Sequence, residues 1–312
     1  MLPTLLHYMG LCAPLFALVG AGWVLMQWRH WPRSWNAPLS RFVFGVALPV
    51  LLFRLMQDLS HLPAVDPQVL LAFFGGSLIV FACARWVALR MFGLDGVSQS
   101  LFALGGIFSN NALLGIPLTQ ATLGDEAMPT VALVLVFNSL TMWTLVTVSV
   151  EWARHGNPSL AGVKATLKGV FTNPIIIGIL SGTLCGALDW RLPAVVDVPL
   201  SWVAVAGGPL ALLTLGIGLA EHGVRQHWRL STGISLVKLG LQPLVVFTLA
   251  HLLGLGHTET RAVTLLASIA TGANVYLMSI QFACLEGPIA AALVQSTMLA
   301  ALTTPLWLAV TA

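Results

Sequence analysis

The residues of this sequence that are best suited to bind a small molecule are two asparagines inside an apolar stretch. Asn110 and Asn111 lie near the middle of the apolar range 100–122, and Gly115 and Pro117 follow them. Two adjacent amides in such surroundings are costly unless hydrogen-bond partners satisfy them. Proline removes a helix hydrogen bond and glycine permits unusual backbone angles, so the pattern predicts an interrupted helix. The free N–H groups at the end of such a helix, together with the amides, suit an anion.

A second stretch of the same character lies in the apolar range 261–284. It contains Thr271, Gly272 and Asn274, preceded by Ala270, and it has no proline. Two interrupted helices that cross at mid-depth would line one substrate site with Asn110, Asn111, Thr271, Gly272 and Asn274. The alternative is that these amides only bond neighbouring helices, with small residues allowing close packing.

Lys238 is the clearest ionisable residue within an apolar range, which runs over 232–254. One interpretation is an interfacial anchor, because the lysine stem carries its ammonium toward the membrane surface. The other is a cation that attracts an anionic substrate or takes part in proton coupling. The four cysteines form no C-x-x-C pair and are interpreted as small buried hydrophobic residues. No metal site and no cofactor are predicted.

The composition predicts an all-α integral membrane protein. Of the 312 residues 57% are hydrophobic and 8% are charged, and the mean hydropathy is +0.90. A soluble domain carries about a quarter charged residues, so this surface must face lipid. Helices are favoured because long runs in lipid leave backbone groups unsatisfied unless they are helical. The net charge of +3 is too small to indicate a nucleic-acid partner.

The apolar runs predict ten transmembrane helices, because a bilayer core takes about 20 apolar residues. They lie at roughly 6–28, 39–57, 68–90, 100–122, 129–151, 170–188, 200–220, 232–254, 261–284 and 288–310. No basic residue precedes the first run, which is interpreted as a retained span rather than a cleaved signal. Basic residues, Arg41 among them, concentrate in the first, third, fifth and seventh loops, which predicts that these loops are cytoplasmic and both termini are not.

Ten spans divide into two units of five, and an odd-numbered unit that is repeated returns inverted. Similar residues recur at nearly one sequence offset in matching spans or loops. The pairs are Pro49 and Pro209, Asn111 and Asn274, Gly124 and Gly287, and Asn138 and Gln295. We therefore predict a first repeat at 1–151, a cytoplasmic linker at 152–169 and a second repeat at 170–312. Such inverted repeats are typical of alternating-access transporters, whose substrate binds at the midplane.

On these residues the chain resembles the auxin efflux carrier family, and within it the short prokaryotic malate or malonate permease-like members. The family's pattern of Asn, Gly and Pro falls on Asn110, Gly115 and Pro117. Further similar stretches begin at Asn173 and Pro174, at Pro209, at Lys238 and at Thr271. The resemblance runs essentially from end to end.

The resemblance implies a scaffold of spans 1, 2, 6 and 7 and a mobile transport domain of spans 3–5 and 8–10. It also implies crossover helices in spans 4 and 9, elevator movement of small carboxylates, and a homodimer formed through the scaffold. The implied location is the bacterial inner membrane. Two departures matter. Ala270 stands where the family usually has proline, which predicts a less sharp second break. Residues 68–84 hold no acid to pair with Lys238, which favours uniport, with H+ or Na+ coupling left open.

The function predicted is a secondary transporter of small organic anions, either mono- or dicarboxylates, malonate-like, malate-like or auxin-like. The alternatives are an anion channel and a membrane sensor that transports nothing. An intramembrane protease is disfavoured, because the sequence has no H-E-x-x-H motif and no aspartate in the middle of a span. His251 also lacks an evident nucleophile partner. We therefore predict that the chain is not an enzyme.

Overall fold

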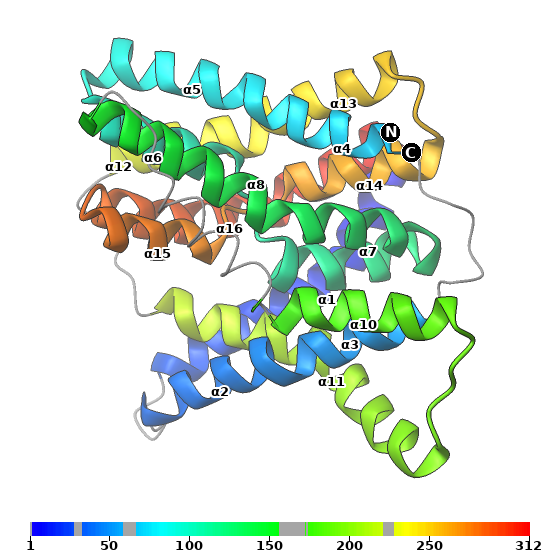
Figure 1. Cartoon of the computed structure of the whole chain (residues 1–312). Coiled ribbons are helices and arrows are strands. Elements are labelled where there is room, and N and C mark those ends of the chain that lie inside the picture. Colours follow the sequence, from blue (N-terminus) through cyan, green and yellow to red (C-terminus); the bar gives the residue numbers. More distant parts are fainter. Residues whose placement is uncertain (1, 28–32, 59–66, 156–171, 173, 221–227) are drawn as a thin grey trace.

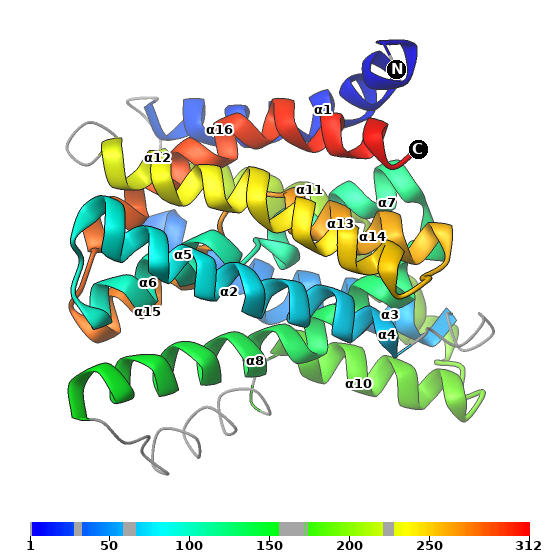
Figure 2. The same cartoon turned by 90° about the horizontal axis from the view of Figure 1, so that it is seen from above.

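The computed structural model describes residues 2–27, 33–58, 67–155, 172, 174–220 and 228–312, and this part of the chain is helical without strands. Most of the predicted linker 152–169 lies outside the described residues, and so does Asn173. The first described residue, Leu2, and the last, Ala312, lie at the same end of the molecule (Figures 1 and 2).

The described residues form fifteen α-helices. They are α1 (Leu2–Gln27), α2 (Asn36–Phe42), α3 (Leu48–Asp58), α4 (Gln68–Leu70), α5 (Gly76–Phe92), α6 (Gly96–Ile107), α7 (Ile116–Leu123), α8 (Met128–His155), α10 (Pro174–Ala187), α11 (Ala194–Ala220), α12 (Trp228–Leu236), α13 (Gln242–Leu252), α14 (His257–Ser268), α15 (Ala273–Phe282) and α16 (Glu286–Val310). Five-residue π-helical turns join some of these helices or precede them. They are Val43–Ala47, Leu71–Gly75, Asn111–Gly115 and Val237–Leu241.

Seven helical stretches within the described residues are long and apolar enough to cross a membrane. They are Leu2–Gln27, Asn36–Arg54, Gln68–Phe92, Asp125–Arg154, Ala194–Ala220, Trp228–Leu252 and Glu286–Val310. The other three predicted ranges also hold helix, but in shorter pieces. α10 has 14 residues, while α6 with α7 and α14 with α15 each occupy one predicted range as two separate helices.

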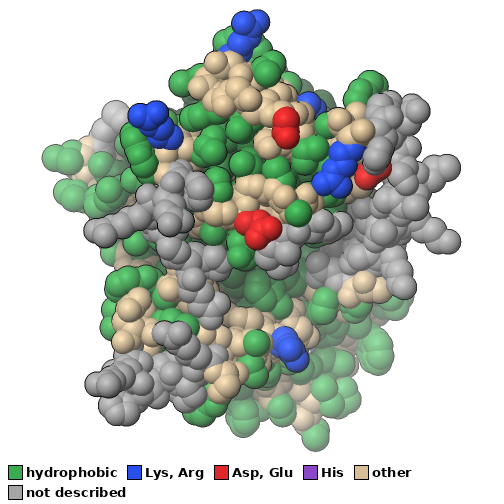
Figure 3. All heavy atoms as spheres, turned by 90° about the vertical axis from the view of Figure 1, so that its left-hand side faces the viewer, with side chains coloured by type: hydrophobic (Ala, Val, Ile, Leu, Met, Phe, Trp, Pro, Cys, Tyr) green, Lys and Arg blue, Asp and Glu red, His purple; other side chains and the backbone are tan. Residues whose placement is uncertain are grey.

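The helices form two groups that lie one above the other in Figure 1. In the lower group α1 packs along α11, and α3 packs against both α10 and α11. Glycines permit this close packing, because a Cβ at Gly216 would collide with the carbonyl oxygen of Val19 and one at Gly182 with that of Phe53. The upper group contains α4–α8 and α12–α16. Figure 3 shows the left-hand end of this arrangement, which is hollowed between the two groups.

Candidate functional site

The site begins where two helices of the upper group are interrupted. α6 ends at Ile107 and Phe108 continues in an extended conformation, with φ −84° and ψ 101°. α14 ends at Ser268 and Ile269 is likewise extended, with φ −79° and ψ 168°. An extended segment cannot satisfy its own backbone groups inside a membrane, so each interruption needs an outside partner.

The two interruptions are each other's partner. Ser109 and Thr271 form an isolated antiparallel bridge. The N–H of Asn110 donates to the carbonyl of Ala270 at 2.9 Å, and the N–H of Gly272 donates to the carbonyl of Phe108 at 2.7 Å. A Cβ at Gly272 would lie 3.0 Å from the Ser109 oxygen, so glycine permits this approach of the two chains. Segments far apart in the sequence are thereby held together at one point.

Gly115 and Pro117 lie beyond the break rather than in it. The interruption occupies Phe108–Asn110, and Gly115 closes the π-helical turn that follows it. Pro117 stands in the first turn of α7. The π-helical turn Asn111–Gly115 runs directly into α7, so Pro117 lies inside a helical stretch that follows the interruption. Pro117 is therefore not part of the extended segment that separates the two helices.

Side chains from neighbouring helices bind the carbonyl groups at the two broken ends. At the end of α6 the amide of Gln242 donates to Ile107 at 2.6 Å. At the end of α14 the side-chain nitrogen of Lys238 donates to the carbonyl of Ala267 at 2.5 Å, and the hydroxyl of Thr304 donates to that of Ser268 at 3.2 Å. Helix ends leave their last carbonyls unpaired, so these contacts stabilise both breaks.

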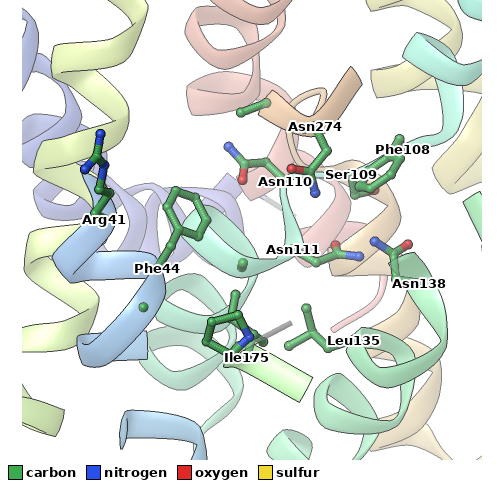
Figure 4. Close-up of a pocket in the computed structure, with 15 residues that line it drawn as sticks. Arg41, Phe44, Phe108, Ser109, Asn110, Asn111, Leu135, Asn138, Ile175 and Asn274 are labelled. Carbon is green, nitrogen blue, oxygen red and sulfur yellow. The ribbon is translucent and has the colours of Figure 1, made fainter. Parts of the chain in front are cut away.

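A cavity of about 470 Å³ adjoins the crossing. Its lining comes from both groups of helices. The residues are Arg41, Phe44, Gly45, Phe108, Ser109, Asn110, Asn111, Ala112, Leu135, Asn138, Pro174, Ile175, Gly272, Ala273 and Asn274. Four of the five residues predicted to bind substrate are among them, and Figure 4 shows three of these, Asn110, Asn111 and Asn274, around the cavity.

The cavity wall carries buried polar atoms that have no hydrogen-bond partner. They are the amide nitrogen of Asn110, both amide atoms of Asn111, the amide oxygen of Asn138 and the hydroxyl of Ser109. The side chains of Asn111 and Asn138 point toward one another in Figure 4. All four residues are at most 5% exposed. An unsatisfied buried polar group costs about 1–3 kcal/mol, so this wall is built to receive a polar ligand or water.

Thr271 and Lys238 are buried outside the cavity lining. The hydroxyl of Thr271 donates to the carbonyl of Gly105 at 2.9 Å, and its N–H donates to the hydroxyl of Ser296 at 3.1 Å. Lys238 is 0% exposed. Both residues hold the crossing together from behind the cavity.

Three polar or charged residues of the wall, Ser109, Asn138 and Arg41, were not among the site residues predicted from the sequence. Asn138 lies in α8 near the middle of a predicted span, the same signal that singled out Asn110. Arg41 lies in α2 at the cavity rim, and it was counted only as a basic loop residue. Of the described residues that line the cavity, Arg41 carries a charge and none is acidic. The cavity therefore has a positive potential that favours an anion.

A second cavity of about 530 Å³ lies between α7 and the helices α1, α3 and α11. It shares no described lining residue with the first. Pro117 and Gln120 line it on one side, and Arg54 lines it on the other, where its guanidinium is paired with the carboxylate of Asp197. The described residues contain no cluster of histidine, cysteine or acidic side chains that could hold a metal ion.

Comparison with known proteins decides the family. The family model described as "Membrane transport protein", which is that of the auxin efflux carriers, matches residues 7–308. The chain belongs to the auxin efflux carrier family. This confirms the resemblance seen in the sequence, and it makes the chain a multi-pass membrane protein of a transport family.

Two relatives are similar in sequence to this auxin efflux carrier family protein over most of its length. A protein of Rhizobium meliloti named "putative malonate transporter" is 24% identical over 297 residues, which cover 94% of this chain and 92% of that protein. A protein of Methanothermobacter thermautotrophicus named "uncharacterized transporter" is 22% identical over 275 residues, which cover 86% of this chain and 87% of that protein.

Proposed function

We propose that this chain is a secondary transporter that carries a small organic anion, such as malonate or a similar carboxylate, through the cavity beside Asn110. The observation that carries this proposal is the group of buried amides without partners where two interrupted helices meet. Amide N–H groups donate to carboxylate oxygens, and Arg41 adds a positive charge at the rim. The volume of about 470 Å³ lies in the usual range of small-molecule sites. The name of the Rhizobium relative supports the substrate class.

The movement we propose is alternating access by ten spans in two inverted units. The scaffold would comprise the predicted spans 1, 2, 6 and 7, and the transport domain spans 3–5 and 8–10. Two features support this. The lower group in Figure 1 contains the helices of the proposed scaffold. The two cavities also lie against different parts of the lower group, the first against α2 and α10 and the second against α1, α3 and α11.

The orientation we propose has Arg41 and the first cavity toward the cytoplasm of a bacterial inner membrane, with both termini on the other side. A homodimer formed through the scaffold completes the proposal. The exposed apolar side chains of α11 support a contact with lipid or with a second copy, since Val195 and Trp202 are each more than 70% exposed. Lys238 bonds a helix end and has no acidic partner within 68–84, which supports uniport over H+ or Na+ coupling.

A carrier is favoured over an anion channel by the closed crossing. The backbone pairs of Phe108 with Gly272 and of Asn110 with Ala270 lie beside the first cavity, and the second cavity shares none of its described lining. A carrier saturates with substrate, whereas a channel conducts at far higher rates without saturation. Uptake measured against malonate concentration separates the two.

The proposal is tested by uptake of labelled malonate into liposomes that contain the purified protein. Asn110→Ala and Asn274→Ala are expected to lower uptake at least about 100-fold, because each removes an amide donor from the anion site. Asn36→Ala is the matched control. Asn36 is a buried asparagine of α2 that does not line the cavity, so this variant is expected to keep most of the uptake. Wild-type rates in both site variants would refute the proposed site.

A further inference from the structure

One stretch of helix reaches the broken ends of both interrupted helices. It runs through α12 and α13, and the π-helical turn Val237–Leu241 lies between them. Lys238 and Gln242 lie in and directly after this turn, and both are 0% exposed. The side-chain nitrogen of Lys238 donates to the carbonyl of Ala267 in α14, and the amide of Gln242 donates to the carbonyl of Ile107 in α6.

Gln242 contacts the residue at which the chain leaves α6 and enters the first interruption. Ile107 is the last residue of α6, and Phe108 leaves it in an extended conformation. The carbonyl of Phe108 then bonds Gly272, and Asn110 follows two residues later. The orientation of the last turn of α6 at Ile107 therefore determines where the side-chain amide of Asn110 lies.

Gln242 is itself held on two sides. Its amide nitrogen also donates to the hydroxyl of Ser77 in α5 at 3.3 Å. Pro243 has no N–H to offer the carbonyl of Leu239 four residues before it. The indole N–H of Trp307 in α16 bonds that carbonyl instead, at 3.0 Å. Gln242 is thus fixed by α5 through its side chain and by α16 through the turn that precedes it.

We infer that Gln242 is a positioning residue of the transport site, an inference that rests on the function proposed above. Gln242 does not line the cavity, so it acts through Ile107 and not on the anion. By holding the end of α6 it keeps Asn110 and Asn111 directed toward the bound carboxylate. Its own amide oxygen is buried without a partner, so both contacts of this side chain, to Ile107 and to Ser77, are donations from the amide nitrogen.

The experiment compares Gln242→Met with Gln295→Met in purified full-length protein. Methionine keeps the length of the side chain and removes the donor. Gln242→Met is expected to weaken malonate binding, measured by titration calorimetry, by about tenfold, and to raise amide hydrogen exchange over residues 105–111. Gln295 donates to the hydroxyl of Thr232 at 2.8 Å rather than to a helix end. Gln295→Met is expected to stay within about twofold of the wild type in binding.

Two results would overturn the inference. One is malonate binding within about twofold of the wild type with unchanged exchange over 105–111. The other is raised exchange with unchanged binding, because Gln242 would then support a helix end without positioning the site. If Gln242→Met does not accumulate as folded protein, Gln242→Asn takes its place, since its amide is one methylene too short to reach Ile107. A wild-type protein that binds no carboxylate would refute the proposed function, while the exchange measurement still tests Gln242.

Discussion

At the first interruption, between α6 and α7, the buried amides of Asn110 and Asn111 keep atoms without partners. At the second, between α14 and α15, the hydroxyl and the N–H of Thr271 are both bonded. Both interruptions line the cavity and both contribute backbone bonds to the crossing. They differ in their central polar side chains, because Asn110 and Asn111 keep atoms that a ligand could bond, whereas Thr271 is already bonded by its neighbours.

The two interruptions also show that these helices break without a proline in the interrupted segment. The first interruption precedes Pro117, which stands in the first turn of α7. The second has Ala270 and no proline, yet Ile269 is extended and the carbonyl of Ala270 accepts from Asn110. The breaks are stabilised by their mutual backbone bonds and by the side chains that bind the helix ends.

The largest effect is expected from Asn111→Leu, which replaces an amide that has no partner by an apolar side chain of similar size. Malonate uptake in liposomes should fall at least about 100-fold, because a donor is lost from the anion site. The melting temperature of the protein without substrate should stay level or rise, because a buried unsatisfied group is removed. A clear fall in melting temperature would show that Asn111 is already bonded in the empty protein.

Thr271→Val is expected to have a smaller effect, which lowers the stability of the protein and leaves uptake nearly unchanged. Valine keeps the shape of threonine but leaves the carbonyl of Gly105 without its donor, so the free energy of unfolding should fall by about 1–3 kcal/mol. The melting temperature in detergent measures this loss. Uptake per folded molecule should stay within about twofold of the wild type, because Thr271 does not line the cavity. Abolished uptake with unchanged stability would make Thr271 a ligand of the substrate.

The smallest effect is expected from Ala270→Pro. Ala270 lies between α14 and α15 in a segment that is not helical, and it takes part in the crossing through its carbonyl, which proline retains. Uptake and melting temperature should both remain close to those of the wild type. A large loss of either would show that the N–H of Ala270 is needed, and it would restore the idea that alanine here sets this chain apart from its family.

The sequence alone singled out Asn110, Asn111 and Asn274, which line the first cavity, because amides near the middle of an apolar run are conspicuous. It was also enough to find both interrupted stretches. It did not identify Asn138 as part of the wall, because nothing in α8 itself shows which side of the helix faces the crossing.

The partners of Lys238 and Gln242 could not be predicted in the same way. Both side chains bond backbone carbonyls, and a carbonyl is present at every residue, so residue types carry no signal of which one is chosen. Lys238 reaches Ala267 across 29 positions and Gln242 reaches Ile107 across 135. Such contacts depend on how the helices pack and are visible only in the folded structure.

The backbone pairing of Phe108 with Gly272 and of Asn110 with Ala270 couples the positions of the two interrupted segments. Each segment of the crossing completes backbone hydrogen bonds of the other, so displacing one segment alone would leave buried N–H and carbonyl groups of its neighbour without partners. We therefore expect the two segments to stay paired during any transport movement.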